Sequence, residues 1–212
     1  MAGTQPVLTV YSDHVCPFCY LGRKSLERVE AERGHQLELD WRPFDLRRDQ
    51  RRPDGTIDHS VDTGKDDAYF EQVQQNVDRL RAEYGASAMI DLDETPDSID
   101  SLPAQLASHV IAETAPAQWR AFDDALLAAL WEDGRDIGDE GVIVSIAESV
   151  GVPSEDIREG LDDEARREQL EDDFADAARA GITGVPTFIY GERLARGAVP
   201  PGKLAQLVDG ES

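Results

Sequence analysis

The sequence is short of cysteine, lysine and long apolar runs. It contains two cysteines, and only three of its 21 basic residues are lysines, against 44 acidic residues. No apolar run approaches the length of about 20 residues that a membrane-spanning helix needs. Residues 1–6 carry neither the basic start nor the apolar core of a secretion signal. We therefore expect a cytoplasmic protein with no membrane partner.

The acidic excess gives a net charge of −23 and is spread over the whole chain. It would repel phosphate groups, so nucleic acid is not expected as a partner. Self-repulsion of this size destabilises a compact chain at low salt, whereas about 1 M salt shortens the Debye length to roughly 3 Å. The charge therefore favours a cytoplasm of very high ionic strength, as in a halophilic microbe.

The two cysteines stand three residues apart, in Cys16-Pro17-Phe18-Cys19, at the start of a segment with helical character. Side chains at positions i and i+3 of a helix lie on one face, roughly 5–6 Å apart between Cβ atoms, within reach of a disulfide. Cys16 would stand at the positive end of the helix dipole, which stabilises the reactive thiolate. Pro17 fits the first turn, where its missing N–H is not needed. The pattern predicts a reactive dithiol.

Hydrophobic periodicity and turn residues predict the order β-α-β, a block of helices, and then β-β-α. Residues 45–64 are polar and irregular, which is typical of a loop. A run of helices between two α/β halves indicates an inserted helical subdomain. The expected strands are 6–12, 36–42, 186–190 and 193–198, and the expected helices are 17–33, 69–84, 102–115, 117–131, 139–150, 154–161, 165–180 and 202–208.

This order, with Cys-x-x-Cys at the first helix, resembles thioredoxin, and with the helical insertion it resembles the DsbA family. Four blocks, at 13–22, 41–44, 134–139 and 181–188, are similar to the FrnE-like branch. That branch includes 2-hydroxychromene-2-carboxylate isomerases and is related to kappa-class glutathione transferases. The resemblance implies an α/β, thioredoxin-like fold: residues 1–62 and 181–212 would form the thioredoxin-like domain, and residues 63–180 the inserted all-helical subdomain.

The resemblance also implies roles for individual residues. Cys16 would be the attacking thiol and Cys19 the resolving one. Val185-Pro186 would match the cis-proline loop, which faces the dithiol and guides the substrate. The isomerase and transferase relatives carry Ser at the first motif position and bind glutathione, so Cys16 favours redox chemistry here. The predicted substrate-binding residues are Val185, Pro186, Pro17, Phe18 and His14, the last either a proton shuttle or merely a residue before the helix.

Three functions stay open at this point. The first is a thiol-disulfide oxidoreductase acting on protein or small-molecule thiols and disulfides. The second is a small-molecule, thiol-dependent isomerase or transferase, and the third is a non-catalytic redox-sensing or binding protein. A structural disulfide between Cys16 and Cys19 would constrain little chain. A zinc site needs about four ligands, and no second paired motif supplies them. We expect no metal and no cofactor beyond the redox-active pair, with a low-molecular-weight thiol as a candidate co-substrate.

Overall fold

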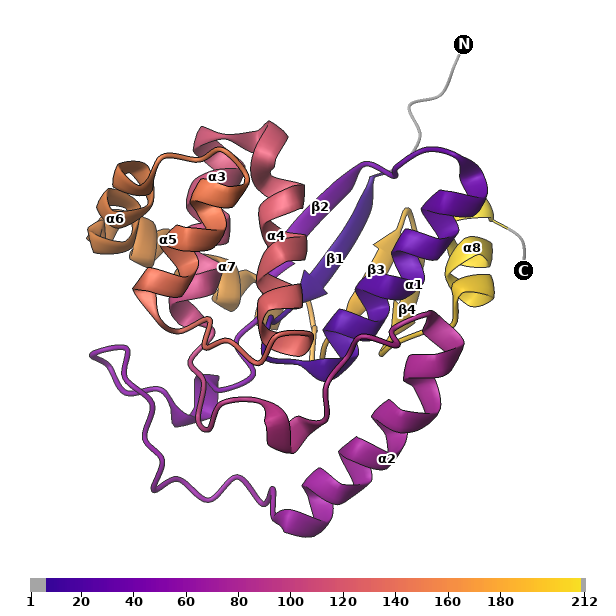
Figure 1. The fold of residues 1–212 in the computed structure, drawn as a ribbon, viewed down its shortest axis with the longest axis horizontal. Coiled ribbons are helices and arrows are strands. Elements are labelled where there is room, and N and C mark those ends of the chain that lie inside the picture. Colours follow the sequence, from indigo (N-terminus) through magenta and orange to yellow (C-terminus); the bar gives the residue numbers. More distant parts are fainter. Residues whose placement is uncertain (1–6, 211–212) are drawn as a thin grey trace.

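A computed structural model describes residues 7–210, and its centre is a mixed sheet with the strand order β2-β1-β3-β4 (Figure 1). β1 pairs with β2 in parallel and with β3 in antiparallel orientation, so Val10 stands between Trp41 and Phe188. β3 and β4 form an antiparallel hairpin. The strands described are β1 (Leu8–Ser12), β2 (Leu39–Pro43), β3 (Thr187–Tyr190) and β4 (Arg193–Arg196).

Helices α1 (Pro17–Arg33) and α8 (Pro201–Asp209) pack against each other and against the sheet. Their apolar side chains form one core with those of the strands, including Leu8, Leu26, Phe188 and Leu204. α1 ends at Gly34, whose φ of 73° is a conformation that glycine adopts without strain. The first and last helices therefore lie side by side on one face of the sheet.

The remaining helices lie between β2 and β3 in the chain. Figure 1 shows α3 to α7 gathered on one side of the sheet, with α2 set apart from them beside α1. Tyr20 and Leu21 of α1 belong to the same core as Val77, Phe122 and Trp131 of this block. These helices are α2 (Asp67–Tyr84), α3 (Leu102–Thr114), α4 (Pro116–Trp131), α5 (Glu140–Ser149), α6 (Ser154–Asp162) and α7 (Glu164–Arg179).

The expected order β-α-β, helices, β-β-α is confirmed, and the chain has a thioredoxin-like fold with a helical insertion. Helix starts follow local chemistry: Asp66 caps α2 by accepting the N–H of Tyr69, and Asp139 caps α5 by accepting that of Val142. The division at residues 62/63 and 180/181 stays a prediction. Among the helices of residues 7–210, none has both the length and the apolar character to cross a membrane.

Several expected boundaries are wrong, each for a local reason. The second strand begins at Leu39 rather than Gln36, because the N–H of Leu37 donates to the Glu30 carboxylate (2.8 Å) instead of to a strand. The fourth strand ends at Arg196, since Gly197 turns the chain and donates its N–H to the Pro186 carbonyl (2.8 Å). Residue 6 of the first expected strand lies outside the described residues.

Candidate redox-active site

Cys16 is the residue immediately before the first turn of α1. Its backbone is extended (φ −89°, ψ 116°), and Pro17 takes the first helical position. The Cys16 carbonyl accepts the N–H of Cys19 (2.9 Å), which closes the first turn. Both cysteines are free of a disulfide bond, and they are 4 % and 3 % exposed. The expected placement of both thiols at the start of the helix is confirmed.

The loop before β3 lies directly against Cys16. The Val185–Pro186 peptide bond is cis, as the resemblance implied. The Cys16 Sγ donates to the Val185 carbonyl at 3.6 Å. Gly22 of α1 lets the loop come this close, because a Cβ there would stand 3.1 Å from Pro186 Cγ and 3.0 Å from Phe188 Cζ. The sulfur and this carbonyl therefore face each other across one short gap.

Cys19 faces the interior. It lines a small cavity of about 20 Å³ between the sheet and α4, together with Ser12, Arg23, Asp123 and Pro186. Burial raises the pKa of the Cys19 thiol well above its ordinary value of 9.0, the neighbouring Cys16 raises it further, and the Ser12 hydroxyl acts in the opposite direction. The thiolate of Cys19 is therefore a minor species at neutral pH.

His14 is buried, and its ring points to α4 rather than to the surface. Its Nε2 lies 2.8 Å from Asp123 Oδ1, and its carbonyl accepts the indole N–H of Trp131 (2.8 Å). Burial raises the pKa of Asp123, but the hydrogen bond and charge of His14, with Arg23, lower it by more, so that it lies below 3.8. His14 thus joins the turn after β1 to the helical block.

A larger cavity, of about 400 Å³, opens on the outer side of Cys16. Of the residues expected to bind substrate, Pro17, Phe18 and Val185 line it. Pro186 lies on the inner side with Cys19. The structure thus divides the predicted residues between an outer cavity, an inner cavity and the buried contact of His14.

The sequence reasoning missed the other wall of the outer cavity, which comes from the loop at 45–65 and from α2. Arg47, Lys65, Tyr69 and Phe70 line it. Adjacent residues of a helix do not share a face, so Tyr69 and Phe70 cannot both reach the core through the same side of α2. Two adjacent aromatic residues on a helix were therefore the signal in the sequence for an exposed apolar surface. In the structure the two side chains are 43 % and 50 % exposed.

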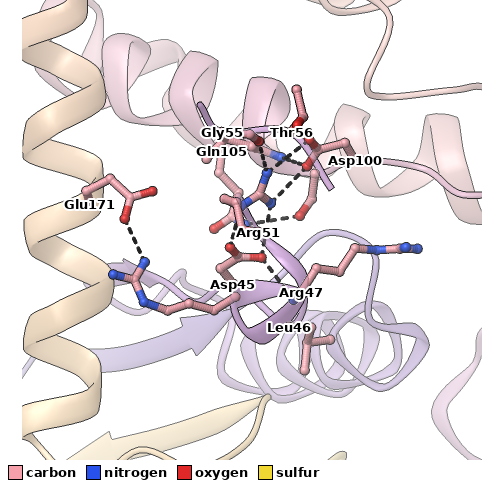
Figure 2. A network of polar contacts seen from close by, with 12 residues as sticks. Asp45, Leu46, Arg47, Arg51, Gly55, Thr56, Asp100, Gln105 and Glu171 are labelled. Carbon is pink, nitrogen blue, oxygen red and sulfur yellow. Dashed lines mark hydrogen bonds and ion pairs between the residues drawn. The ribbon is translucent and has the colours of Figure 1, made fainter. Parts of the chain in front are cut away.

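A buried ion-pair network holds this loop beside the dithiol (Figure 2). The guanidinium of Arg51, whose side chain is 5 % exposed, contacts the carboxylates of Asp45 (2.7 Å) and Asp100 (3.0 Å). Asp45 also accepts the N–H of Arg47 (2.9 Å). The carboxylate of Asp13, in the turn before Cys16, accepts the N–H of Leu46 (2.9 Å), and burial raises the pKa of this carboxyl group. The loop is therefore joined by a hydrogen bond to the turn that precedes Cys16.

Comparison with known proteins identifies a family and several similar structures. A model of the family described as the DSBA-like thioredoxin domain matches residues 7–209. The uncharacterized protein YwbO of Bacillus subtilis (strain 168) is 27% identical over 195 residues, covering 90% of each chain. Among solved structures, 2-hydroxychromene-2-carboxylate isomerase superposes with a TM-score of 0.75 at 19% identity, over 96% of this chain and 93% of that one.

Another similar structure is the cytosolic disulfide reductase DsbM from Pseudomonas aeruginosa, solved with GSH. It superposes with a TM-score of 0.62 at 20% identity, over 96% of this chain and 94% of that one. At these identities the two structural likenesses show a common fold. The sheet and its helical insertion are thus an arrangement shared by proteins of different named activities.

Proposed function

Because the chain belongs to the family of DSBA-like thioredoxin domains, we propose that it is a thiol-disulfide oxidoreductase working through Cys16 and Cys19. The observation that carries the proposal is the pair of free cysteines at the start of α1, with the Cys16 sulfur against the Val185 carbonyl. Cys16 borders the open cavity and Cys19 the closed one. The geometry supports an attacking and a resolving thiol.

The reaction transfers two electrons from the two thiols to the substrate disulfide. The Cys16 thiolate attacks one substrate sulfur, the substrate S–S bond breaks, and a mixed disulfide forms while the first substrate thiol leaves. The Cys19 thiolate then attacks Cys16 Sγ and releases the second substrate thiol. The protons lost by the cysteines balance those taken up by the two products. The reverse sequence oxidises a dithiol.

A second candidate is a small-molecule isomerase or transferase, which the likeness to 2-hydroxychromene-2-carboxylate isomerase favours. Cys16 argues against it, because those relatives carry Ser at that position of the motif. A redox-sensing protein without turnover is a third. For each of them we propose a cytoplasmic setting of high ionic strength, which the net charge of −23 supports.

The test is turnover in the reduction of insulin by dithiothreitol at high salt. We expect turnover by the wild type, none by Cys16→Ser, and a trapped mixed disulfide in Cys19→Ser. Activity of Cys16→Ser equal to that of the wild type would contradict the proposal. Isomerase or transferase activity retained in that variant would instead support the second candidate.

A further inference from the structure

The outer cavity at Cys16 differs in charge from the rest of the molecule. Asp and Glu supply 44 of the 212 residues of the chain, yet none of the residues lining this cavity is acidic. Two of them, Arg47 and Lys65, are basic. A protein with a net charge of −23 therefore presents a locally positive wall beside its attacking thiol.

Neither cation is neutralised by a carboxylate among the described residues. Thirteen of the 21 Arg and Lys side chains, all of which lie within residues 7–210, form an ion pair with a carboxylate of that range, and Arg47 and Lys65 are among the eight that form none. The contact of Arg47 with Asp45 is made by its backbone N–H, and Figure 2 shows the side chain extending away from Asp45 and Arg51. Asp66, next to Lys65, is engaged in capping α2. Both charges are thus available to a ligand.

Apolar surface accompanies the two cations. Tyr69 and Phe70 meet edge to face with ring centroids 5.3 Å apart, and both are largely exposed. The Lys65 Nζ stands 5.9 Å from the Tyr69 ring centroid. Phe18 reaches the same cavity from the dithiol side. A ligand whose sulfur lies at Cys16 would have aromatic rings for its carbon atoms and cations for its charged end.

The basic lining of the cavity at Cys16 gives way to acidic residues in the next cavity. A neighbouring cavity of about 810 Å³ shares Val15, Arg47, Phe70 and Leu92 with the first one, but Cys16 does not line it. Its lining includes five carboxylates, those of Asp67, Glu71, Asp91, Asp93 and Asp97. An extended acidic polypeptide lying along both cavities would meet these carboxylates and be repelled. The arrangement suits an anion that fits within the 400 Å³ at Cys16.

We propose that this cavity selects low-molecular-weight disulfides that carry carboxylates. The sulfur lies at Cys16, the carboxylates lie at Arg47 and Lys65, and the carbon atoms lie against Tyr69 and Phe70. The inference rests on the proposed disulfide exchange and names its substrate class. The first step gives the mixed disulfide with Cys16 and one anionic thiol, and attack by Cys19 releases the second, so the reduced protein supplies both electrons.

The net charge and the cavity predict opposite preferences, which makes the test sharp. Pre-reduced protein is mixed with cystamine, bis(2-hydroxyethyl) disulfide or 3,3′-dithiodipropionate, which are cationic, neutral and anionic. Each rate constant is divided by that of the same disulfide with dithiothreitol, which removes differences in intrinsic reactivity. We expect the anionic disulfide to react fastest, by about tenfold over the neutral one, as two partly exposed ion pairs would give. A normalised rate highest for cystamine would overturn the proposal.

Matched variants locate the preference. The double substitution Arg47→Gln with Lys65→Gln should slow the anionic disulfide about tenfold and leave the neutral one within about twofold. Lys203→Gln on α8, outside the cavity, removes one positive charge where the double variant removes two, and it should leave both rates unchanged. Unchanged neutral-disulfide rates show that the double variant is folded and reactive. An equal effect of Lys203→Gln would overturn the proposal.

Two further results separate the neighbouring hypotheses. If none of the three disulfides reacts, the proposed oxidoreductase function fails, and this inference fails with it. If all react but an acidic polypeptide disulfide reacts faster than dithiodipropionate and loses that advantage in the double variant, the ligand is a polypeptide and the small-molecule assignment is overturned. All rates are compared in one KCl buffer in which every variant is folded.

Discussion

The surroundings of Cys16 and Cys19 differ more than their spacing indicates. The Cys16 sulfur faces the Val185 carbonyl and the outer cavity, whereas Cys19 is enclosed with Arg23 and Asp123. Burial is the largest cause of the raised pKa of Cys19, and it persists after Cys16 has entered a mixed disulfide. In the proposed exchange, we therefore expect the attack by Cys19 to depend on its deprotonation.

This asymmetry predicts the pH dependence of the second step. Below the pKa of Cys19, the thiolate fraction rises about tenfold per pH unit. We expect release of the second thiol from a Cys16 mixed disulfide to accelerate continuously as pH rises to 9, because the pKa of Cys19 lies well above 9.0. Stopped-flow release of thionitrobenzoate measures it, with Cys19→Ser as the variant that releases nothing. A plateau between pH 7 and 8 would show that the thiol is not held protonated by burial.

Asp123 is the carboxylate on which the buried contact of His14 depends. Asp123→Ala leaves the buried His14 ring without its carboxylate, whereas Arg23 keeps its ion pair with Asp124. Removing one member of a buried pair costs about 3 kcal/mol or more. Denaturant unfolding at neutral pH measures the loss. Glu168→Ala, which removes an exposed carboxylate on α7, should change the free energy of unfolding by less than about 0.5 kcal/mol.

The stability that the Asp123 carboxylate contributes depends on pH in a direction that its pKa fixes. The pKa of Asp123 in the folded protein lies below its ordinary value of 3.8, so its stabilising contribution is present above that pH. It is lost as pH falls through the lower, folded-state pKa. The difference in stability between the wild type and Asp123→Ala should therefore shrink in acid below pH 3.8. A difference that grows on acidification would contradict the contact with His14.

At the scale of elements, the insertion depends on close helix packing. Gly160 of α6 faces Val110 of α3, and a Cβ at residue 160 would stand 2.6 Å from Val110 Cγ2. Such a distance is shorter than any normal contact between carbon atoms. The absence of a side chain at Gly160 thus sets how closely α6 approaches α3.

Substitution of this glycine should reverse the usual effect of alanine in a helix. Ala normally stabilises a helix relative to Gly by roughly 0.5–1 kcal/mol. At Gly160 we expect Gly160→Ala to destabilise by about 1–3 kcal/mol because the helices must separate. Gly202→Ala in α8, where no atom lies within 4 Å of the added Cβ, should be stabilising. Thermal unfolding of both variants shows whether each substitution stabilises or destabilises the protein. Adding Val110→Ala to Gly160→Ala should reduce the destabilisation, because it removes the methyl groups that the added Cβ would meet.

At the scale of the whole molecule, charge dominates. Acidic side chains exceed basic ones by 23, and the exposed ion pairs each contribute little. Repulsion among the remaining carboxylates opposes the compact state until salt screens it. The same repulsion disfavours an anionic substrate over the molecule as a whole, and Arg47 and Lys65 oppose it beside Cys16.

The melting temperature should accordingly rise with salt. We expect it to increase steadily from low to multimolar KCl, because screening removes repulsion from the folded state. A circular-dichroism melt at each concentration measures it, with sucrose at matched osmolality as the uncharged control. A melting temperature independent of KCl would rule out the halophilic setting that the net charge favours.

Local patterns in the sequence were enough to predict the order of the helices and strands and the position of the two cysteines at a helix start. Pro17, Gly34 and the cap Asp139 act within a few residues of their own position, so both ends of α1 could be predicted, and those of α5 to within one residue. The expected start of α2 at residue 69 misses the cap Asp66, since the helix begins at Asp67. The start of β2 could not, since it depends on the carboxylate of Glu30 in another element. Only the resemblance, and no local pattern, pointed to the cis bond before Pro186.

Tertiary structure alone decided the surroundings of the two thiols. The contact of His14 with Asp123 joins residues 109 positions apart. The loop at 45–65 is joined to Asp13 by the N–H of Leu46 and to Asp100 by the guanidinium of Arg51. Such contacts depend on how the insertion packs on α1, which no periodicity records. The sequence by itself therefore determined that a reactive pair exists at a helix start, and the fold determined what faces each sulfur.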